Sequence, residues 1–209
     1  TLTSRTVAAT SAFTRARRLG YVSAATAGSF AQGYEPTVAQ FTLGDGTSAG
    51  GFYYVARFGI SDAATVAGAR MFVGLTSALT AATNVEPNTL TNAIGIAQLS
   101  TDATQLYVVY GGSAAQTAVA VGTNFPCTAV SVNWYEFIMY APTNSNNTVY
   151  WQINNLSTGN TNQGTLTGTA GTVLPANTTF LAQRFWRTNN ATALAVGLDI
   201  GSIYIETDM

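Results

Sequence analysis

The chain has 209 residues, of which 47% are hydrophobic and 8% are charged, and it contains no histidine. All eight basic residues are arginine, so the two side chains that most often transfer protons at neutral pH, histidine and a tuned lysine, are both missing. The sequence therefore favours a binding or structural protein. The formal net charge of −1 predicts no nucleic acid partner, and the absence of a long apolar run predicts no membrane insertion.

The first 34 residues show little alternation of apolar and polar side chains and carry a basic cluster of Arg15, Arg17 and Arg18. We expect residues 1–34 to be a connector from an upstream stalk, or a segment swapped with a neighbouring subunit. Residues 35–209 are expected to form one β-sandwich receptor-binding domain. The arginine cluster is interpreted as a solvated or subunit-interface patch, and contact with phosphate or an acidic sugar is the alternative.

From residue 50 onward, apolar and polar residues alternate with the period of two that is typical of half-buried strands. The alternating segments are residues 52–58, 71–75, 106–110, 134–140, 149–154, 180–187 and 194–205. Turns rich in glycine and asparagine separate these segments. The polar residues of the chain are mostly threonine, serine and asparagine, whereas helical surfaces are usually rich in charged residues and glutamine. The sequence therefore predicts an all-β fold, an antiparallel sandwich of the jelly-roll or lectin-like kind.

The last strand changes phase near its middle. Leu198 and Ile200 are apolar at even positions, whereas Ile203 and Ile205 are apolar at odd ones. A bulge at Gly201 would let one continuous strand keep both apolar sets inward.

One short helix is predicted in the connection at residues 61–69. Asp62 stands where a side chain can accept hydrogen bonds from the first backbone N–H groups of a helix. No segment has the helical length needed to connect parallel strands, which argues against an α/β fold.

Metal and cofactor sites are disfavoured by the residue types. Without histidine, and with Cys127 as the single cysteine, the chain lacks the ligands for a zinc or copper site. Calcium is the alternative, with Gly44-Asp45-Gly46 and Asp102 as candidate loops, although neither has EF-hand spacing. We predict no cofactor, and we expect Cys127 to be a buried thiol without a catalytic role.

Glycoside hydrolysis needs two carboxyl groups on either side of a cleft. Glu136 is the only acidic residue inside a strongly aromatic strand, and that strand offers no second acid two or four residues away. We expect Glu136 to form an ion pair with Arg184 or Arg187, and we predict that the protein is not an enzyme. A glycan depolymerase that combines Glu136 with an acid from elsewhere in the chain is the alternative.

Sugar recognition fits the residue types better, since it uses aromatic faces and neutral hydrogen-bonding groups. These types concentrate at residues 150–152, 160–163 and 184–190. We predict ligand contacts from loops rather than strand centres. The candidate ligand-binding residues are Asn160, Asn162, Trp186, Arg187, Asn189 and Asn190. The alternative is that the aromatics belong to the core, which the strand parity of Trp186 favours, and that the asparagines form turns.

Two segments carry a recognisable pattern. The first is Gly51-Phe52-Tyr53-Tyr54-Val55-Ala56-Arg57-Phe58-Gly59-Ile60, continuing through residues 69–75. The second is Phe185-Trp186-Arg187-Thr188-Asn189-Asn190, continuing into residues 196–200 and 203–208. With Glu86-Pro87 and Asn124-Phe125-Pro126, the pattern resembles a block near the C-terminus of many tailed-phage fibre and virion structural proteins, over roughly residues 15–209.

The resemblance implies the receptor-binding tip of a phage tail fibre. Such a domain would be a homotrimer that recognises the host by binding a bacterial surface glycan or surface protein. It would be located in the virion, at the fibre tip, after synthesis in the host cytoplasm, and the missing initial methionine agrees with a C-terminal piece of a longer stalked protein. No catalytic residues carry over. The alternatives are a structural virion part, such as a head decoration or collar protein, and a glycan depolymerase.

Overall fold

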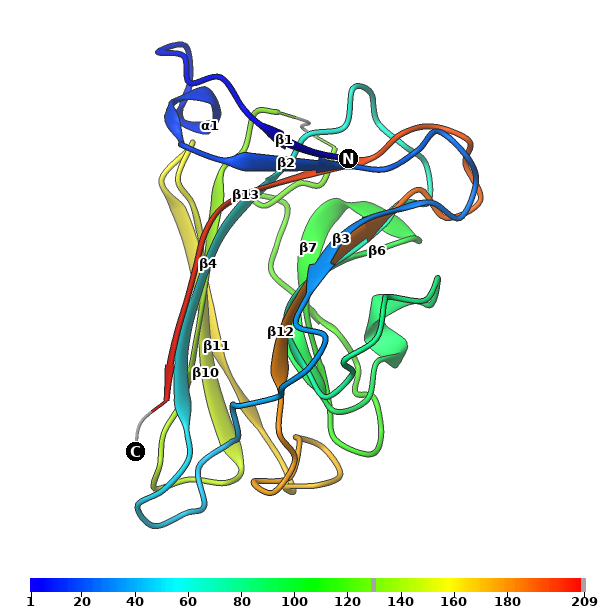
Figure 1. Ribbon diagram of the computed structural model, residues 1–209. Helices are drawn as coiled ribbons and strands as arrows, with labels where there is room; N and C mark the ends of the chain where they lie inside the picture. Colours follow the sequence, from blue (N-terminus) through cyan, green and yellow to red (C-terminus); the bar gives the residue numbers. More distant parts are fainter. Residues whose placement is uncertain (129–130, 208–209) are drawn as a thin grey trace.

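The structure, a computed structural model, describes residues 1–128 and 131–207. Within these residues, thirteen strands form two antiparallel sheets that stack face to face (Figure 1). Helical turns in the described part are limited to α1 (Ala12–Arg15) and the 3-10 helix η1 (Pro87–Thr89), and neither could cross a membrane. The predicted all-β antiparallel sandwich is therefore confirmed. The last residues of the second recognised segment, from 208 on, lie outside the described part.

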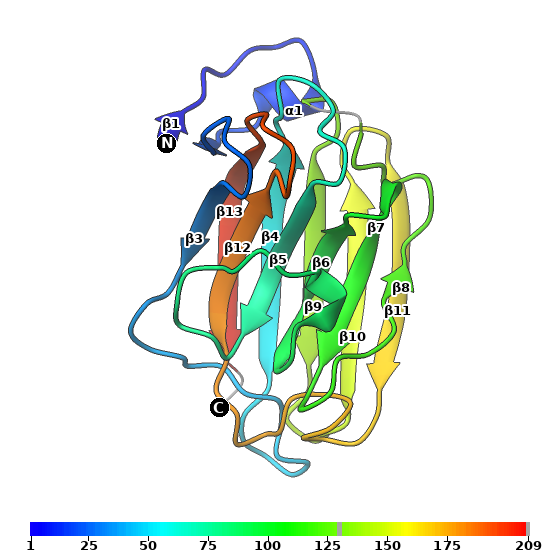
Figure 2. The ribbon, with the colours of Figure 1, turned by 90° about the vertical axis from the view of Figure 1, so that its right-hand side faces the viewer.

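One sheet, here called the front sheet, lies on the left in Figure 1. Its strands in spatial order are β1 (Leu2–Ser4), β2 (Leu19–Val22), β13 (Gly197–Thr207), β4 (Phe52–Ile60), β9 (Tyr135–Ala141), β10 (Thr148–Asn155) and β11 (Asn160–Thr167). The other sheet, the back sheet, faces the viewer in Figure 2. Its strands in spatial order are β3 (Phe30–Tyr34), β12 (Ala182–Thr188), β5 (Arg70–Thr76), β6 (Ala93–Leu99), β7 (Asp102–Gly111) and β8 (Val119–Ala120).

The main core fills the space between the two sheets. The alternation predicted for β4 is confirmed, because Phe52, Tyr54, Ala56 and Phe58 are all fully buried. The other strands contribute their inward residues to the same cluster: Met71, Val73, Leu75, Leu106, Val108, Tyr135, Phe137, Met139, Val149, Trp151 and Ile153. Each buried side chain of this size contributes roughly 1.5–3 kcal/mol to the free energy of unfolding through removal of apolar surface from water.

The phase change predicted in the last strand is confirmed as a bulge. The pairing of β13 with β4 shifts register between Ile200 and Ser202, and Gly201 is the extra residue. Ile200 is buried on one side of the bulge, and Ile203 and Ile205 pack against the same core on the other. The apolar sets at even and odd positions thus both face inward.

A second apolar layer covers the outer side of the back sheet. Trp186 and Phe72 stack there with ring centroids 6.4 Å apart, and Ala82 and Leu90 pack onto them from the segment between β5 and β6. The outer side of the back sheet is therefore partly closed by its own connections.

The helix predicted at residues 61–69 is wrong. This connection between β4 and β5 contains only turns and bends, with Gly68 at a φ of 70°. Asp62 does not cap a helix, because its carboxylate is buried and accepts hydrogen bonds from Arg187 at 2.8 and 2.5 Å and from the Gly197 backbone N–H at 2.7 Å. An ion pair with a distant strand thus takes the oxygens that a helix N-terminus would have used.

The N-terminal segment joins both sheets of the same chain. β2 pairs with β13, and β3 pairs with β12, so residues 1–34 contribute strands to the sandwich. The role of this segment as a connector from an upstream stalk, or as a segment exchanged with a neighbouring copy, stays a prediction.

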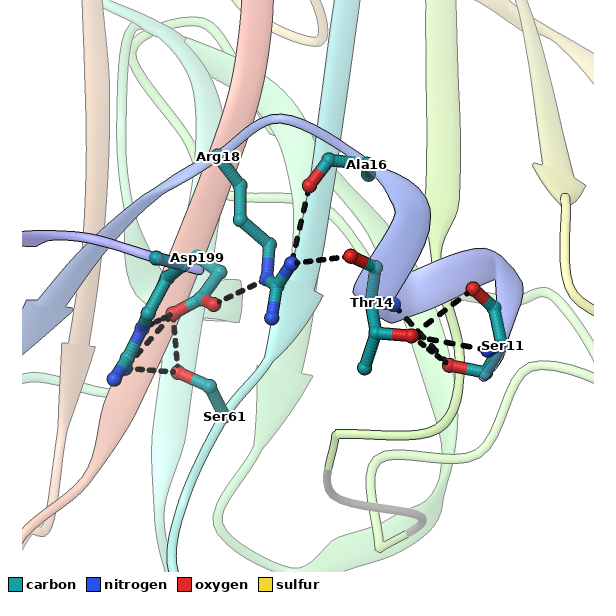
Figure 3. Close-up of polar contacts among 7 residues, drawn as sticks. Ser11, Thr14, Ala16, Arg18, Ser61 and Asp199 are labelled. Atoms are coloured by element: carbon teal, nitrogen blue, oxygen red, sulfur yellow. Dashed lines mark hydrogen bonds and ion pairs between the residues drawn. The ribbon is translucent and has the colours of Figure 1, made fainter. Parts of the chain in front are cut away.

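The segment between β1 and β2 is anchored on the outer side of the front sheet. Arg18 donates to Asp199 at 2.9 Å and to the carbonyls of Thr14 and Ala16, so its guanidinium lies between the strand and the helical turn (Figure 3). Phe13 packs edge-on against Trp134, with ring centroids 5.6 Å apart. The solvated patch expected for the arginine cluster is thus wrong for Arg18, which is buried because it must neutralise the buried carboxylate of Asp199.

Candidate functional site

The outer face of the front sheet is formed by the side chains that alternate with those of the core. From Ser202 onward, beyond the bulge, the registers of β13, β4, β9, β10 and β11 are continuous, so these side chains stand in three rows across the sheet. In that strand order, the rows are Ser202, Arg57, Glu136, Asn154 and Thr161; Tyr204, Val55, Ile138, Gln152 and Gln163; and Glu206, Tyr53, Tyr140, Tyr150 and Thr165. Neighbours in a row are about 5 Å apart, which places aromatic, amide and charged groups within reach of one ligand.

The third row contains an exposed aromatic pair. Tyr140 and Tyr150 are 40% and 48% exposed, and their rings are stacked with centroids 6.2 Å apart and planes inclined by 18°. A hollow of about 350 Å³ opens beside them, lined also by Ile138, Gln152 and Gln163. Because exposed tyrosine rings offer apolar surface and the neighbouring glutamines offer hydrogen-bonding groups, this hollow suits a ligand with an apolar face and polar edges.

The first row is a polar network. Arg57 donates to Glu136 at 2.6 Å, and Asn154 donates to the other oxygen of Glu136 at 3.1 Å. The side-chain oxygen of Asn154 accepts from Gln152 and from Thr161, each at 2.9 Å. The predicted ion pair of Glu136 with Arg184 or Arg187 is wrong, since the register of β4 and β9 places Arg57 directly opposite Glu136.

Two of the predicted site residues lie near this face without pointing into it. Residues 160–163 were expected to form a loop, but they begin strand β11, which corrects that expectation. Asn160 donates to Thr158, and Asn162 donates to the carbonyl of Val121 at 2.8 Å, on the core side of the strand. Their neighbours Thr161 and Gln163 are the residues of this segment that face outward.

The other predicted site residues hold the fold together. Trp186 is 1% exposed, within the second apolar layer, and Arg187 is 1% exposed, bound to Asp62 and to Gln98. Asn189 is fully buried and donates to the carbonyls of Thr26 and Leu194, while its oxygen accepts from Ser29. The ligand contacts predicted for these three residues would require them to leave those partners.

Asn190 is the remaining predicted site residue, and it is partly exposed. It adopts a φ of 52°, in the left-handed region that asparagine tolerates best after glycine, and its side-chain oxygen accepts from Asn84 at 3.2 Å. It belongs to the turn after β12, away from the tyrosine pair. Its role in ligand binding stays a prediction.

Sequence reasoning missed Tyr140, Gln152 and the role of Tyr150. The segment 150–152 was noted as rich in sugar-binding types, but no residue of it was chosen. The signal that could have found these residues is strand parity: once Val149, Trp151 and Ile153 are taken as core, their alternating neighbours must face solvent. Which strands lie beside β10 could not be read from the sequence.

The candidate calcium loops use their carboxylates internally. Asp45 accepts hydrogen bonds from the backbone and side chain of Thr47, which lower its pKa to about 2. Hydrogen bonds from Thr104 and Tyr107 likewise hold the pKa of Asp102 below its usual range. Within residues 1–128 and 131–207, no three Asp, Glu, Cys or His side chains gather as a metal site would require.

Cys127 is buried, as expected, and its thiol donates to the carbonyl of Gln105 at 3.2 Å. Burial raises its pKa from an ordinary value of 9 to about 12. Because the unfolded thiol ionises above about pH 9 while the buried one stays neutral, this contribution to stability is fully present below about pH 9 and is lost as the pH rises from 9 to 12.

We expect Ellman's reagent at pH 8 to leave the native protein unmodified and to titrate one thiol per chain after unfolding in guanidinium chloride. The matched control is the Cys127→Ser variant, which should give no signal in either state. Rapid labelling of the native protein would contradict the burial of this thiol.

Comparisons with known proteins support the fold. Neither a protein-family model nor a curated protein sequence matches the chain. Among solved structures, it is similar to the lectin UEA-II in complex with galactose, with a TM-score of 0.60 and 12% identity, over 100% of this chain and 92% of that one. Arcelin-5, a lectin-like defence protein from Phaseolus vulgaris, gives a TM-score of 0.57 and 10% identity, over 99% and 91% of the two chains.

An alginate lyase of polysaccharide lyase family 7 is also similar, with a TM-score of 0.51 and 10% identity, over 92% of this chain and 80% of that one. At these levels of identity, the three likenesses establish a shared architecture. The chain has a lectin-like β-sandwich fold.

Proposed function

We propose that the protein is a non-enzymatic carbohydrate-binding domain that presents the outer face of the front sheet to a glycan. The observation that carries this proposal is the stacked pair of Tyr140 and Tyr150 beside a hollow lined by Gln152 and Gln163. Sugar rings have an apolar face that stacks on tyrosine and hydroxyl groups that pair with amides. The likeness to a lectin solved with galactose supports the same class of ligand.

Within this proposal, the domain is the host-recognition tip of a phage tail fibre, and its glycan belongs to a bacterial surface. The support is the resemblance of residues 51–60 and 185–190 to phage fibre and virion proteins. In a homotrimer, three copies on one axis would convert a weak affinity per site into useful avidity. A structural virion part is the alternative role for the same chain.

A glycan depolymerase is the second candidate, supported by the likeness to an alginate lyase and by Glu136 on the same face. Both oxygens of Glu136 are engaged by Arg57 and Asn154. Glu206, the other acid in the three rows, stands two strands and two rows away, roughly 17 Å between Cα atoms by strand geometry. Glycosidases hold their two carboxyl groups within about 10 Å, so this face favours binding over hydrolysis.

The test is a screen of the fluorescently labelled chain on an array of neutral and acidic bacterial surface polysaccharides and on intact bacterial strains. We expect binding to a subset of the polysaccharides, with competition by the same polysaccharide in solution. Failure to bind any of them would favour the structural role, and release of oligosaccharides from a bound polysaccharide would favour the depolymerase.

A further inference from the structure

A second hollow, of about 530 Å³, lies where the N-terminal segment meets β13. Arg5, Arg17 and Arg18 line it, together with Ser4 and Gly201. Four of the eight arginines of the chain, these three and Arg15, fall within residues 5–18. Positive charge is thus gathered at one end of a protein whose other residues carry a net negative charge, with four arginines against nine acidic residues.

Two of the three guanidinium groups are fixed in place. Arg5 donates to Asp199 at 3.1 Å and to Ser61 at 3.3 Å, and Arg18 donates to the other oxygen of Asp199 at 2.9 Å. Asp199 is fully buried, so its single negative charge is shared by two arginines. The pair of arginines therefore keeps one excess positive charge.

Arg17 adds a second excess charge to the same hollow. Its side chain is exposed, and it makes no hydrogen bond or ion pair with any residue in the described part of the chain. Arg17 therefore offers unused N–H donors beside two arginines that share a single carboxylate, and planar guanidinium groups match the oxygens of a carboxylate, sulfate or phosphate.

The hollow borders the rows of the outer face. Gly201 lines it, and the next residue, Ser202, stands in the first row opposite Arg57. From Ser202, the rows lead across β4 and β9 to the tyrosine pair on β9 and β10. By strand geometry, the tyrosine pair lies roughly 17–20 Å from Ser202, so an extended polymer that spans several sugar units can contact both the tyrosines and the arginines.

We propose that this arginine hollow binds an oxyanion carried by the glycan, so that the ligand class of the domain is an acidic polysaccharide. The inference rests on the proposed function, because it places the charged group on the same polymer that stacks on Tyr140 and Tyr150. The fixed arginines supply a preorganised positive site, and Arg17 supplies the donors that remain unused.

The experiment compares Arg17→Gln with Arg15→Gln on the same array of neutral and acidic polysaccharides. Both changes remove one exposed positive charge, but the Arg15 side chain donates to the carbonyl of Ala9 and does not line the hollow. We expect Arg17→Gln to weaken binding to acidic polysaccharides about tenfold, and Arg15→Gln to change it less than about twofold. Binding should also fall as the salt concentration rises.

A second arm of the experiment tests whether the bound anion is a group carried by the polysaccharide. Each acidic polysaccharide that binds is tested again after reduction of its carboxyl groups or removal of its sulfate or phosphate groups, and inorganic phosphate is tested as a competitor. Loss of affinity on neutralising the polymer is the expected result, and free phosphate, an oxyanion of the same kind, should compete with the acidic polysaccharide at millimolar concentration. Unchanged affinity of the neutralised polymer would overturn the assignment to an anion carried by the glycan.

The two proposals fail differently in this design. If binding depends on the tyrosines but selects neutral polysaccharides, or if the two arginine variants behave alike, the arginine hollow is overturned and the glycan-binding face stands. If no polysaccharide on the array binds, the proposed function fails, and the inference fails with it.

Discussion

The Arg187→Ala variant is expected to lose about 3–5 kcal/mol of unfolding free energy, because it leaves the buried carboxylate of Asp62 without its partner. Arg187 donates to Asp62 through two nitrogens and to Gln98 through a third, and all three side chains are buried. The ion pair joins β12 to the connection between β4 and β5. Without the Arg187 side chain, the Asp62 carboxylate keeps only the hydrogen bond from the Gly197 backbone N–H among those found in the described part of the chain.

Guanidinium chloride unfolding, followed by tryptophan fluorescence, measures this loss. The matched control is Arg15→Ala, an exposed arginine whose removal should change the free energy of unfolding by no more than about 0.5 kcal/mol. An Arg187 variant as stable as this control would show that the ion pair with Asp62 is not buried in solution. The prediction also separates a structural Arg187 from a ligand-binding one, since the variant should be destabilised whether or not glycan is present.

The double variant Tyr140→Ala with Tyr150→Ala is expected to weaken glycan binding by about 30-fold or more, because it removes the stacked rings on which the sugar lies. Both side chains are substantially exposed, so the free energy of unfolding should fall by less than about 1 kcal/mol. Array binding and titration calorimetry measure the affinity, and circular dichroism confirms the strand content.

Phe180→Ala is the matched control for this change. Phe180 is 57% exposed and lies between β11 and β12, outside the three rows of the outer face. It should leave glycan affinity within about twofold of the original chain. An equal loss in both variants would point to a general effect of removing exposed aromatics, and no loss in the double variant would move the site away from this face.

Local pattern was enough to predict seven of the strands that the structure describes, together with their core faces and the bulge; these strands are β4, β5, β7, β9, β10, β12 and β13. The alternation of Phe52, Tyr54, Ala56 and Phe58, and the phase change at Gly201, are properties of neighbouring residues, and both survive in the structure. The loop expected at residues 160–163 was wrong, because asparagine is disfavoured in strands, whereas pairing with β10 holds this segment in one.

The missed features depend on contacts between distant parts of the chain. The local sequence predicted Asp62 as a helix cap, because its partner Arg187 lies 125 residues away in the chain. Glu136 was predicted to pair with Arg184 or Arg187, because the sequence does not show that the register of β4 and β9 places Arg57 opposite Glu136. The tyrosine pair likewise exists only because β9 and β10 are neighbours, which composition and spacing do not encode.

The central claim is that the glycan lies on the outer face of the front sheet. Backbone amide chemical shifts of the labelled protein, recorded while a polysaccharide fragment selected on the array is added, test it most directly. We predict that the largest changes fall in β9, β10 and β11, around Tyr140, Tyr150 and Gln163, with smaller changes near Ser202. Changes confined to the turn at Asn189 and Asn190 or to the back sheet, with the three rows unaffected, would contradict the claim.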